Sequence, residues 1–250
     1  MFARIAAFEF RYQLRNPVLW VAAGLFFLFT YGFVASDQVR IGDAGGNTHE
    51  NGPFSIAQTH LVFSIFYMFV TAAFVANVVV RDDDTGYGPI VRSTRITKFD
   101  YLFGRFTGAL LVAILGFLAI PLGIWIGSAM PWIDPETLGP NRIEYYAWPF
   151  LVLAVPNVLV TSAIFFALAT ATRSMMATYV GVIAVLIVWV VINTSLESNP
   201  ELQEGLAIAD PFGFQAFEQV TRYWTAAERN AGLPDVAGLV LWIAVGLVVD

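Results

Sequence analysis

Six stretches of this chain contain no Asp, Glu, Lys or Arg, and this pattern limits the possible folds more than any other feature of the sequence. The charge-free stretches are residues 16–36, 51–80, 106–133, 145–172, 174–196 and 236–249. The hydrocarbon core of a bilayer is about 30 Å thick, and a helix needs ~20 apolar residues to cross it. The first five stretches are long enough, so the sequence predicts an all-α, polytopic transmembrane helical bundle.

The composition agrees with a chain that lies mostly in lipid. Hydrophobic residues make up 58% of the chain and charged residues 13%, whereas soluble domains have roughly 45–50% and ~25%. We expect a single transmembrane domain over residues 1–250, with an interfacial helix over 1–15. The six predicted spans are about 17–36, 59–80, 106–127, 149–171, 175–194 and 236–250.

The last apolar stretch is shorter than the other five. Its 14 residues, 236–249, would extend ~21 Å as a helix, which is less than the thickness of the hydrocarbon core. We therefore expect the sixth span to be truncated in this sequence and the chain to be a piece of a longer polypeptide.

The basic residues are distributed unevenly between the two sides that six spans define. If the N-terminus is cytoplasmic, 9 Lys and Arg residues lie on the cytoplasmic side and 4 on the outer side. This bias follows the positive-inside rule, so we expect a multi-pass protein of the bacterial inner membrane with a cytoplasmic N-terminus. Arg4, Arg11 and Arg15 share one stripe of the helix predicted over 1–15, which is typical of a helix lying among lipid headgroups.

The cytoplasmic loop over residues 81–105 holds the first group of candidate functional residues. An acidic segment with Thr and Gly ends the second span, and an apolar pair and two arginines follow it. These residues are Asp84, Thr85, Gly86, Ile90, Val91, Arg92 and Arg95. Two interpretations stay open: a hairpin that inserts into a soluble partner, or a solvated loop whose charges only fix the topology. The aspartates at 82–84 lack the spacing of a calcium loop, so we expect no metal there.

The outer loop over residues 197–235 holds the second group. Asp210 and Pro211 form a predicted helix start, and Phe214, Phe217 and Trp224 follow at helical spacing. Thr225-x-x-Glu228 is a capping box that predicts a second short helix. These helices before the sixth span either gate an exit path or shield the bundle, and the candidate gate residues are Pro211, Phe214, Phe217 and Trp224.

The sequence offers few groups for catalysis. The chain has no cysteine and 2 histidines, His49 and His60, and it contains neither H-E-x-x-H nor the P-loop that cradles phosphates. Ser64 lies one helical turn after His60, but a serine in that place usually serves packing. We expect no catalytic residue, no metal and no cofactor in this chain, and no nucleic-acid partner. Pro121 and Pro156 predict kinks, either as hinges or as packing features.

The order of these features resembles an ABC-2 type transporter permease, the membrane-spanning subunit of a bacterial ABC transporter. In that family an acidic Thr/Gly segment, a coupling helix and a basic stretch follow span two, and a Gly-Lys/Arg pair opens span three. The corresponding positions here are Asp83-Asp84-Thr85-Gly86, residues 90–95 and Gly104-Arg105, with Pro89 as a departure from the pattern. The outer segment DPFGFQAFEQVTRYWTAAERN is similar to permeases that continue into a second membrane half and, in some cases, a fused M1-family aminopeptidase.

The resemblance implies an exporter in which a separate ABC ATP-binding subunit binds ATP and acts on the cytoplasmic loop. It also implies a second permease half, either another copy or a fused one. Because the spans carry no charge, an amphiphile, a lipid-linked molecule or a peptide is a more compatible cargo than a small ion. Two other classes stay open, a non-transporting scaffold or channel subunit and an intramembrane enzyme.

Overall fold

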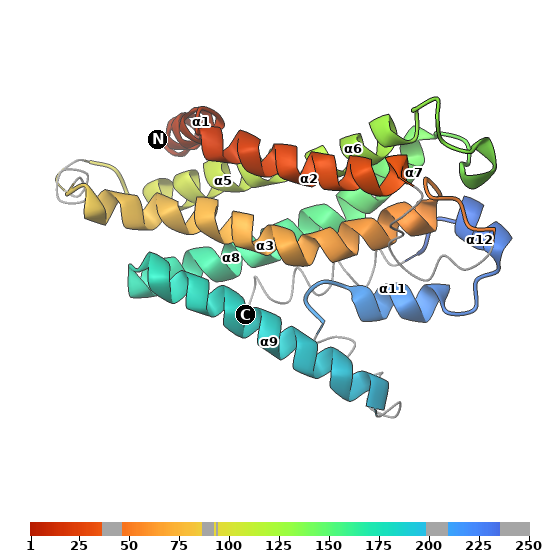
Figure 1. Ribbon diagram of the computed structural model, residues 1–250. Coiled ribbons are helices and arrows are strands. Elements are labelled where there is room, and N and C mark those ends of the chain that lie inside the picture. The colour runs from red at the N-terminus through yellow and green to blue at the C-terminus, as the bar shows by residue number, and fades with distance from the viewer. Residues whose placement is uncertain (37–46, 87–92, 94, 199–209, 236–250) are drawn as a thin grey trace.

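The computed structural model describes residues 1–36, 47–86, 93, 95–198 and 210–235 (Figure 1). Every regular element in these ranges is a helix. Five helical segments among the described residues are long and apolar enough to cross a membrane, namely Pro17–Ala35, Pro53–Asp82, Lys98–Gly127, Ile143–Thr172 and Met175–Thr194. The prediction of an all-helical fold is therefore confirmed for the described residues, and five of their helices have the length and composition expected of membrane spans. The sixth predicted span, residues 236–250, lies outside the described residues.

The described helices follow the chain in the order in which Figure 1 labels them. They are α1 (Phe2–Leu14), α2 (Pro17–Ala35), α3 (Pro53–Asp84), α5 (Lys98–Phe117), α6 (Ala119–Gly127), the 3₁₀ turn η1 (Pro135–Thr137), α7 (Ile143–Pro149), the π-helical turn η2 (Phe150–Ala154), α8 (Val155–Thr172), α9 (Met175–Ser198), α11 (Phe214–Thr221) and α12 (Ala226–Ala231).

Several helices extend beyond the spans expected from charge-free length. α3 begins at Pro53 and continues to Asp84, and α5 begins at Lys98, where the Thr97 hydroxyl accepts a hydrogen bond from the Asp100 backbone N–H at 3.1 Å. A capped helical turn outside the hydrocarbon core tolerates charged side chains. The absence of charge therefore marks the part of a helix that lies in lipid, and the caps mark where the helix ends.

Prolines interrupt two of the spans. Pro121 has no N–H to donate to the Phe117 carbonyl, and the helix breaks at Leu118 between α5 and α6. Pro149 and Pro156 flank the π-helical turn η2, which joins α7 to α8. Both breaks keep the two helical halves in one membrane-crossing segment, so the predicted interruptions are present as local distortions.

α3 lies at the centre of the bundle and contacts α5, α8 and α9. The Tyr67 hydroxyl of α3 donates a hydrogen bond to the Ala113 carbonyl of α5 at 2.7 Å, and its ring meets Phe117 edge-on. On another side of the bundle, α2 packs closely on α6. A Cβ at Gly123 would lie 2.6 Å from the Phe27 carbonyl oxygen, so this approach requires glycine.

α1 lies across the bundle, and the spans run along it. Figure 1 shows α1 nearly end-on beside the start of α2, while α2, α3 and α8 cross the view. α1 packs on α5 at two glycines one turn apart, Gly104 and Gly108. A Cβ at Gly108 would stand 2.6 Å from the Ala6 carbonyl oxygen and 2.7 Å from the Glu9 Cβ. The transverse placement is the one expected of an interfacial helix.

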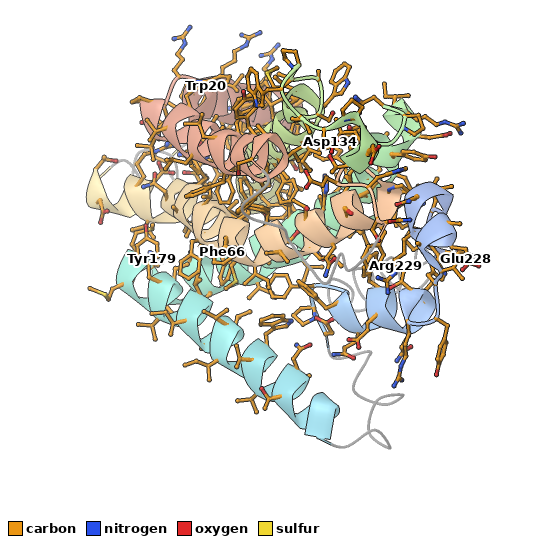
Figure 2. All side chains as sticks on the ribbon, turned by 45° about the vertical axis from the view of Figure 1, so that its right-hand side comes forward. Trp20, Phe66, Asp134, Tyr179, Glu228 and Arg229 are labelled. Carbon is orange, nitrogen blue, oxygen red and sulfur yellow. The ribbon has the colours of Figure 1, made fainter. Side chains whose placement is uncertain are left out.

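At the other end of the bundle, α12 closes over the start of α3 (Figure 2). The His49 backbone N–H donates to the Asn230 side-chain oxygen at 2.7 Å, and the Asn230 amide donates to the Asn47 carbonyl at 2.7 Å. The Arg229 guanidinium lies 4.8 Å from the centre of the Phe54 ring. The predicted capping box at Thr225 is present in full, so the second short helix of this loop is confirmed.

Candidate functional site

Four charged side chains meet where α1 crosses the ends of α3 and α5, and we call them the Glu9 cluster. Glu9 Oε2 accepts hydrogen bonds from Arg81 Nη2 at 2.9 Å and from Arg105 Nη1 at 2.7 Å. Arg105 also forms an ion pair with Asp82. Glu9 has no exposed surface, and the Arg105 side chain is 7% exposed.

Local sequence and close packing place Glu9 in this cluster. Glu9 and Gln13 are one turn apart on the side of α1 that faces the bundle, and Gln13 Nε2 donates to Glu9 Oε1 at 2.9 Å. Gly104 and Gly108 let the backbone of α1 approach α5. Arg105 lies between these glycines in the sequence, so the close approach of the two helices brings its guanidinium to the Glu9 carboxylate.

The cluster is electrically balanced. It contains the carboxylates of Glu9 and Asp82 and the guanidiniums of Arg81 and Arg105. Both arginines also contact a tyrosine. The Arg81 guanidinium lies 4.2 Å from the centre of the Tyr12 ring, and Arg105 Nη2 donates a hydrogen bond to the Tyr101 hydroxyl at 3.1 Å. A buried charge is tolerated only when it is paired and hydrogen-bonded, so the four groups depend on one another.

The cluster ties both ends of the segment between α3 and α5 to α1. Arg81 and Asp82 lie in the last turn of α3 before the loop, and Arg105 lies two turns into α5 after it. Ion pairs therefore join α1, α3 and α5 on both sides of this segment.

The predicted coupling residues lie in three different places relative to this cluster. Asp84 ends α3, and the N–H and the hydroxyl of Thr85 both donate to the Arg81 carbonyl, at 3.0 and 2.8 Å. Gly86 follows with φ of 67°, a backbone conformation that favours glycine. Arg95 is exposed and outside the cluster. Ile90, Val91 and Arg92 lie outside the described residues.

The predicted gate residues lie between α9 and α12, and their aromatic side chains pack against the spans. Phe217 lies 5.2 Å from Phe54 of α3, and Phe214 lies 5.4 Å from Trp189 of α9, between ring centres. Trp224 packs on the same buried cluster as Phe217. These contacts hold α11 against α3 and α9. The choice between gate and shield remains a matter of prediction.

The start of α11 differs from the expectation. Pro211 lies in a turn and is not the first helical residue, because α11 begins at Phe214 after Gly213, whose φ is 83°. Asp210 still caps this backbone, since its carboxylate accepts from the N–H groups of Phe212 and Gln215 at 3.0 and 2.8 Å. Burial raises the pKa of Asp210, and these hydrogen bonds together with the one from Trp189 oppose that rise.

The His60 and Ser64 pair is arranged for packing. His60 is fully buried, with its Nδ1 2.7 Å from the Ile56 carbonyl oxygen, and the Ser64 hydroxyl donates to the His60 backbone carbonyl at 2.7 Å. The serine therefore contacts the backbone of His60 and not its imidazole. Within the described ranges, no group of three or more His, Cys, Asp and Glu side chains is placed to hold a metal ion.

No protein-family model matches this sequence, and no curated protein matches it either. Its function therefore has to be argued from the arrangement of its own residues.

The cluster includes residues that sequence reasoning did not select. Glu9 was not singled out, and Arg81 and Arg105 were counted only for topology and as part of a Gly-Arg pair. A signal was available, because Glu9 and Gln13 are polar residues at i and i+4 on the side of the first helix opposite the arginine stripe. Their place on the apolar side predicts a buried partner, which a solvent-facing pair would not need.

Proposed function

We propose that this chain is the membrane-spanning permease subunit of an ATP-driven transporter of the ABC-2 type. In this proposal the N-terminus and the Glu9 cluster face the cytoplasm of a bacterial cell, in its inner membrane. A separate ATPase subunit docks on the loop over residues 85–97 and hydrolyses the ATP. The observation that carries the proposal is the Glu9 cluster, because it joins both ends of that loop to the helix lying across the spans.

The proposed mechanism follows from rigidity at this junction. α3 runs without a break from Pro53 to Asp84, and it is the central helix of the bundle. A force applied to the loop by a closing ATPase would reach α3 through Arg81 and Asp82, and α5 through Arg105. The breaks at Leu118 and in η2 lie farther along the spans, where a hinge would convert that force into a change of packing.

Exposed apolar surface supports a larger assembly in lipid. Side chains on the outward faces of α2 and α9 are largely exposed, among them Leu28, Phe29, Ile183 and Ile187 at 51–62%. These faces, together with a sixth span, would meet lipid and a second permease half, either another copy or a fused one. Because the five described spans carry no charge in their centres, the proposed cargo is an amphiphile, a lipid-linked molecule or a peptide, and the proposed direction is export.

Reconstitution with an ABC ATP-binding subunit tests the proposal. The tagged chain is purified from native membranes, and a co-purifying protein with a P-loop is identified and reconstituted with it in proteoliposomes. We expect ATP hydrolysis by that subunit to rise in the presence of the chain. A chain that purifies without any ATPase and shows no ATP-dependent transport would contradict the proposal. ATPase association without transport would identify a scaffold.

A double variant tests the proposed contact between the loop and the ATPase subunit. Ile90→Asp with Val91→Asp should leave membrane insertion intact and uncouple ATP hydrolysis from transport, since an apolar docking pair becomes charged. The control is Ile143→Asp with Val220→Asp, which changes two exposed apolar residues, 83% and 37% accessible, at the opposite end of the bundle. Unchanged transport in the loop variant would rule out this contact.

A further inference from the structure

A groove runs along the outward side of α1 and the first turn of α2. It has a volume of about 790 Å³, and its walls include Arg4, Phe8, Arg11, Arg15 and Pro17. This volume is within the range of small-molecule sites, roughly 300–1,000 Å³. The groove lies on the side of α1 away from Glu9, and it shares Tyr12, whose ring also contacts Arg81, with the surroundings of the Glu9 cluster.

The groove carries uncompensated positive charge. Arg4, Arg11 and Arg15 are all exposed, and none of them forms an ion pair with any residue in the described ranges. None of its lining residues is acidic, and Glu9, the single carboxylate of α1, points to the other side. Arg81 and Arg105 at the same end of the bundle are by contrast neutralised within the Glu9 cluster. Three free guanidiniums in one groove select an anion.

The walls between the arginines are aromatic. Phe8 and Tyr12 stack with their ring centres 6.2 Å apart, and they are 62% and 48% exposed. Next to the groove, Trp20 is 59% exposed and donates its indole N–H to the Leu14 carbonyl at 2.8 Å, on the outside of the bundle (Figure 2). An anion bound here is therefore flanked by rings that favour the boundary between water and hydrocarbon.

The position of α1 indicates which anion fits. α1 lies across the ends of the helices that are long enough to cross a membrane (Figure 1), and Pro17, at the end of the groove, is followed in α2 by the exposed apolar residues Val18 and Val21. An occupant of the groove that also covers this neighbouring face must present negative charge to the arginines and hydrocarbon to the valines. We propose that the groove binds the headgroup of an anionic phospholipid, with its phosphate on the arginines and its glycerol end against Phe8 and Tyr12.

The test compares phosphatidylglycerol with phosphatidylcholine. The full chain is purified in detergent, and its melting temperature and its bound lipids, by native mass spectrometry, are measured after addition of either lipid or of inorganic phosphate. The wild type should retain and be stabilised by phosphatidylglycerol. Arg4→Gln with Arg11→Gln and Arg15→Gln should lose affinity for it on the order of 100-fold, from about fivefold for each arginine near a membrane surface.

Two further variants separate binding from folding. Lys98→Gln with Arg142→Gln and Arg222→Gln removes the same amount of charge from exposed positions outside the groove and should keep the preference. Replacing the three groove arginines with lysine should also keep most of it. Equal effects of the two lipids on the wild type would overturn the proposal. A triple Gln variant of the groove that still prefers phosphatidylglycerol would also overturn it, and would point instead to a protein-docking surface. Equal stabilisation by inorganic phosphate would show a free-anion site and overturn it too.

Discussion

Glu9→Gln is the most direct perturbation of the cluster that joins α1 to the ends of α3 and α5. The substitution keeps the shape of the side chain but replaces Oε2, which accepts from Arg81 and Arg105, with an NH₂ group. Two guanidinium donors then face a third donor. The cluster also changes from a balanced set of charges to a net charge of about +1, at a position with no exposed surface.

The expected cost follows from burial. Removing one partner of a buried ion pair costs about 3–5 kcal/mol, whereas an exposed pair contributes roughly 0–1 kcal/mol. A control exists in the same chain, because the pair between Arg142 and Glu144 has side chains that are 61% and 55% exposed. Glu144→Gln removes the same carboxylate charge without creating a buried unpaired cation.

The assay is the apparent melting temperature of the purified protein in one detergent. For 150–250 residues, 1 kcal/mol corresponds to a shift of about 2–4 °C. Glu9→Gln should therefore lower the melting temperature by roughly 6–20 °C, and Glu144→Gln by less than about 4 °C. Adding Arg105→Gln to Glu9→Gln should cost less than the sum of the two single changes, since the double variant restores charge balance. Equal, small shifts for Glu9→Gln and Glu144→Gln would refute the account of the cluster.

Three other predictions follow from particular residues. Gly108→Ala should destabilise the protein by about 1–3 kcal/mol because its Cβ meets the backbone of α1, while Gly24→Ala, which meets nothing within 4 Å, should be neutral or slightly stabilising in a thermal melt. The chain has no native cysteine, so an impermeant maleimide should label Glu136→Cys in intact cells and Arg95→Cys only after permeabilisation; the reverse result would invert the proposed orientation. Burial raises the pKa of Asp210 above its ordinary value of 3.8. The protonated side chain therefore contributes stability that is fully present below pH 3.8 and is lost as pH rises through the raised pKa. Asp210→Asn should remove this downward slope from the pH dependence of the melting temperature, and an unchanged slope would contradict the assignment.

The parts of the fold that local chemistry determines could be predicted from the sequence. The five described spans follow from apolar length, and the helix stop at Thr85 and Gly86 and the capping box at Thr225 each involve residues within a few positions of one another. Such features depend on backbone hydrogen bonds that a nearby side chain supplies. These features can therefore be predicted before any tertiary contact is known.

The Glu9 cluster could not be predicted in the same way because its ion pairs join residues that are 23 to 96 positions apart in the chain. Whether a charge at the end of a span faces water or another charge depends on how closely two helices approach. Here that approach is set by Gly104 and Gly108. The start of α11 was misplaced for a related reason, since Asp210 caps a turn around Gly213 and the expected Pro-initiated helix does not form.

The proposed coupling role and the proposed lipid site involve opposite faces of α1. Its inward face, through Glu9 and Gln13, bonds to α3 and α5, and its outward face presents Arg4, Arg11 and Arg15 to the groove. The two sets share no residue, and the helix between them is 13 residues long. A change to the outward arginines leaves every ion pair of the cluster intact, so lipid preference and coupling are measured on independent variants. Because the same helix carries both sets, lipid held on one face would also limit how far the other face can move.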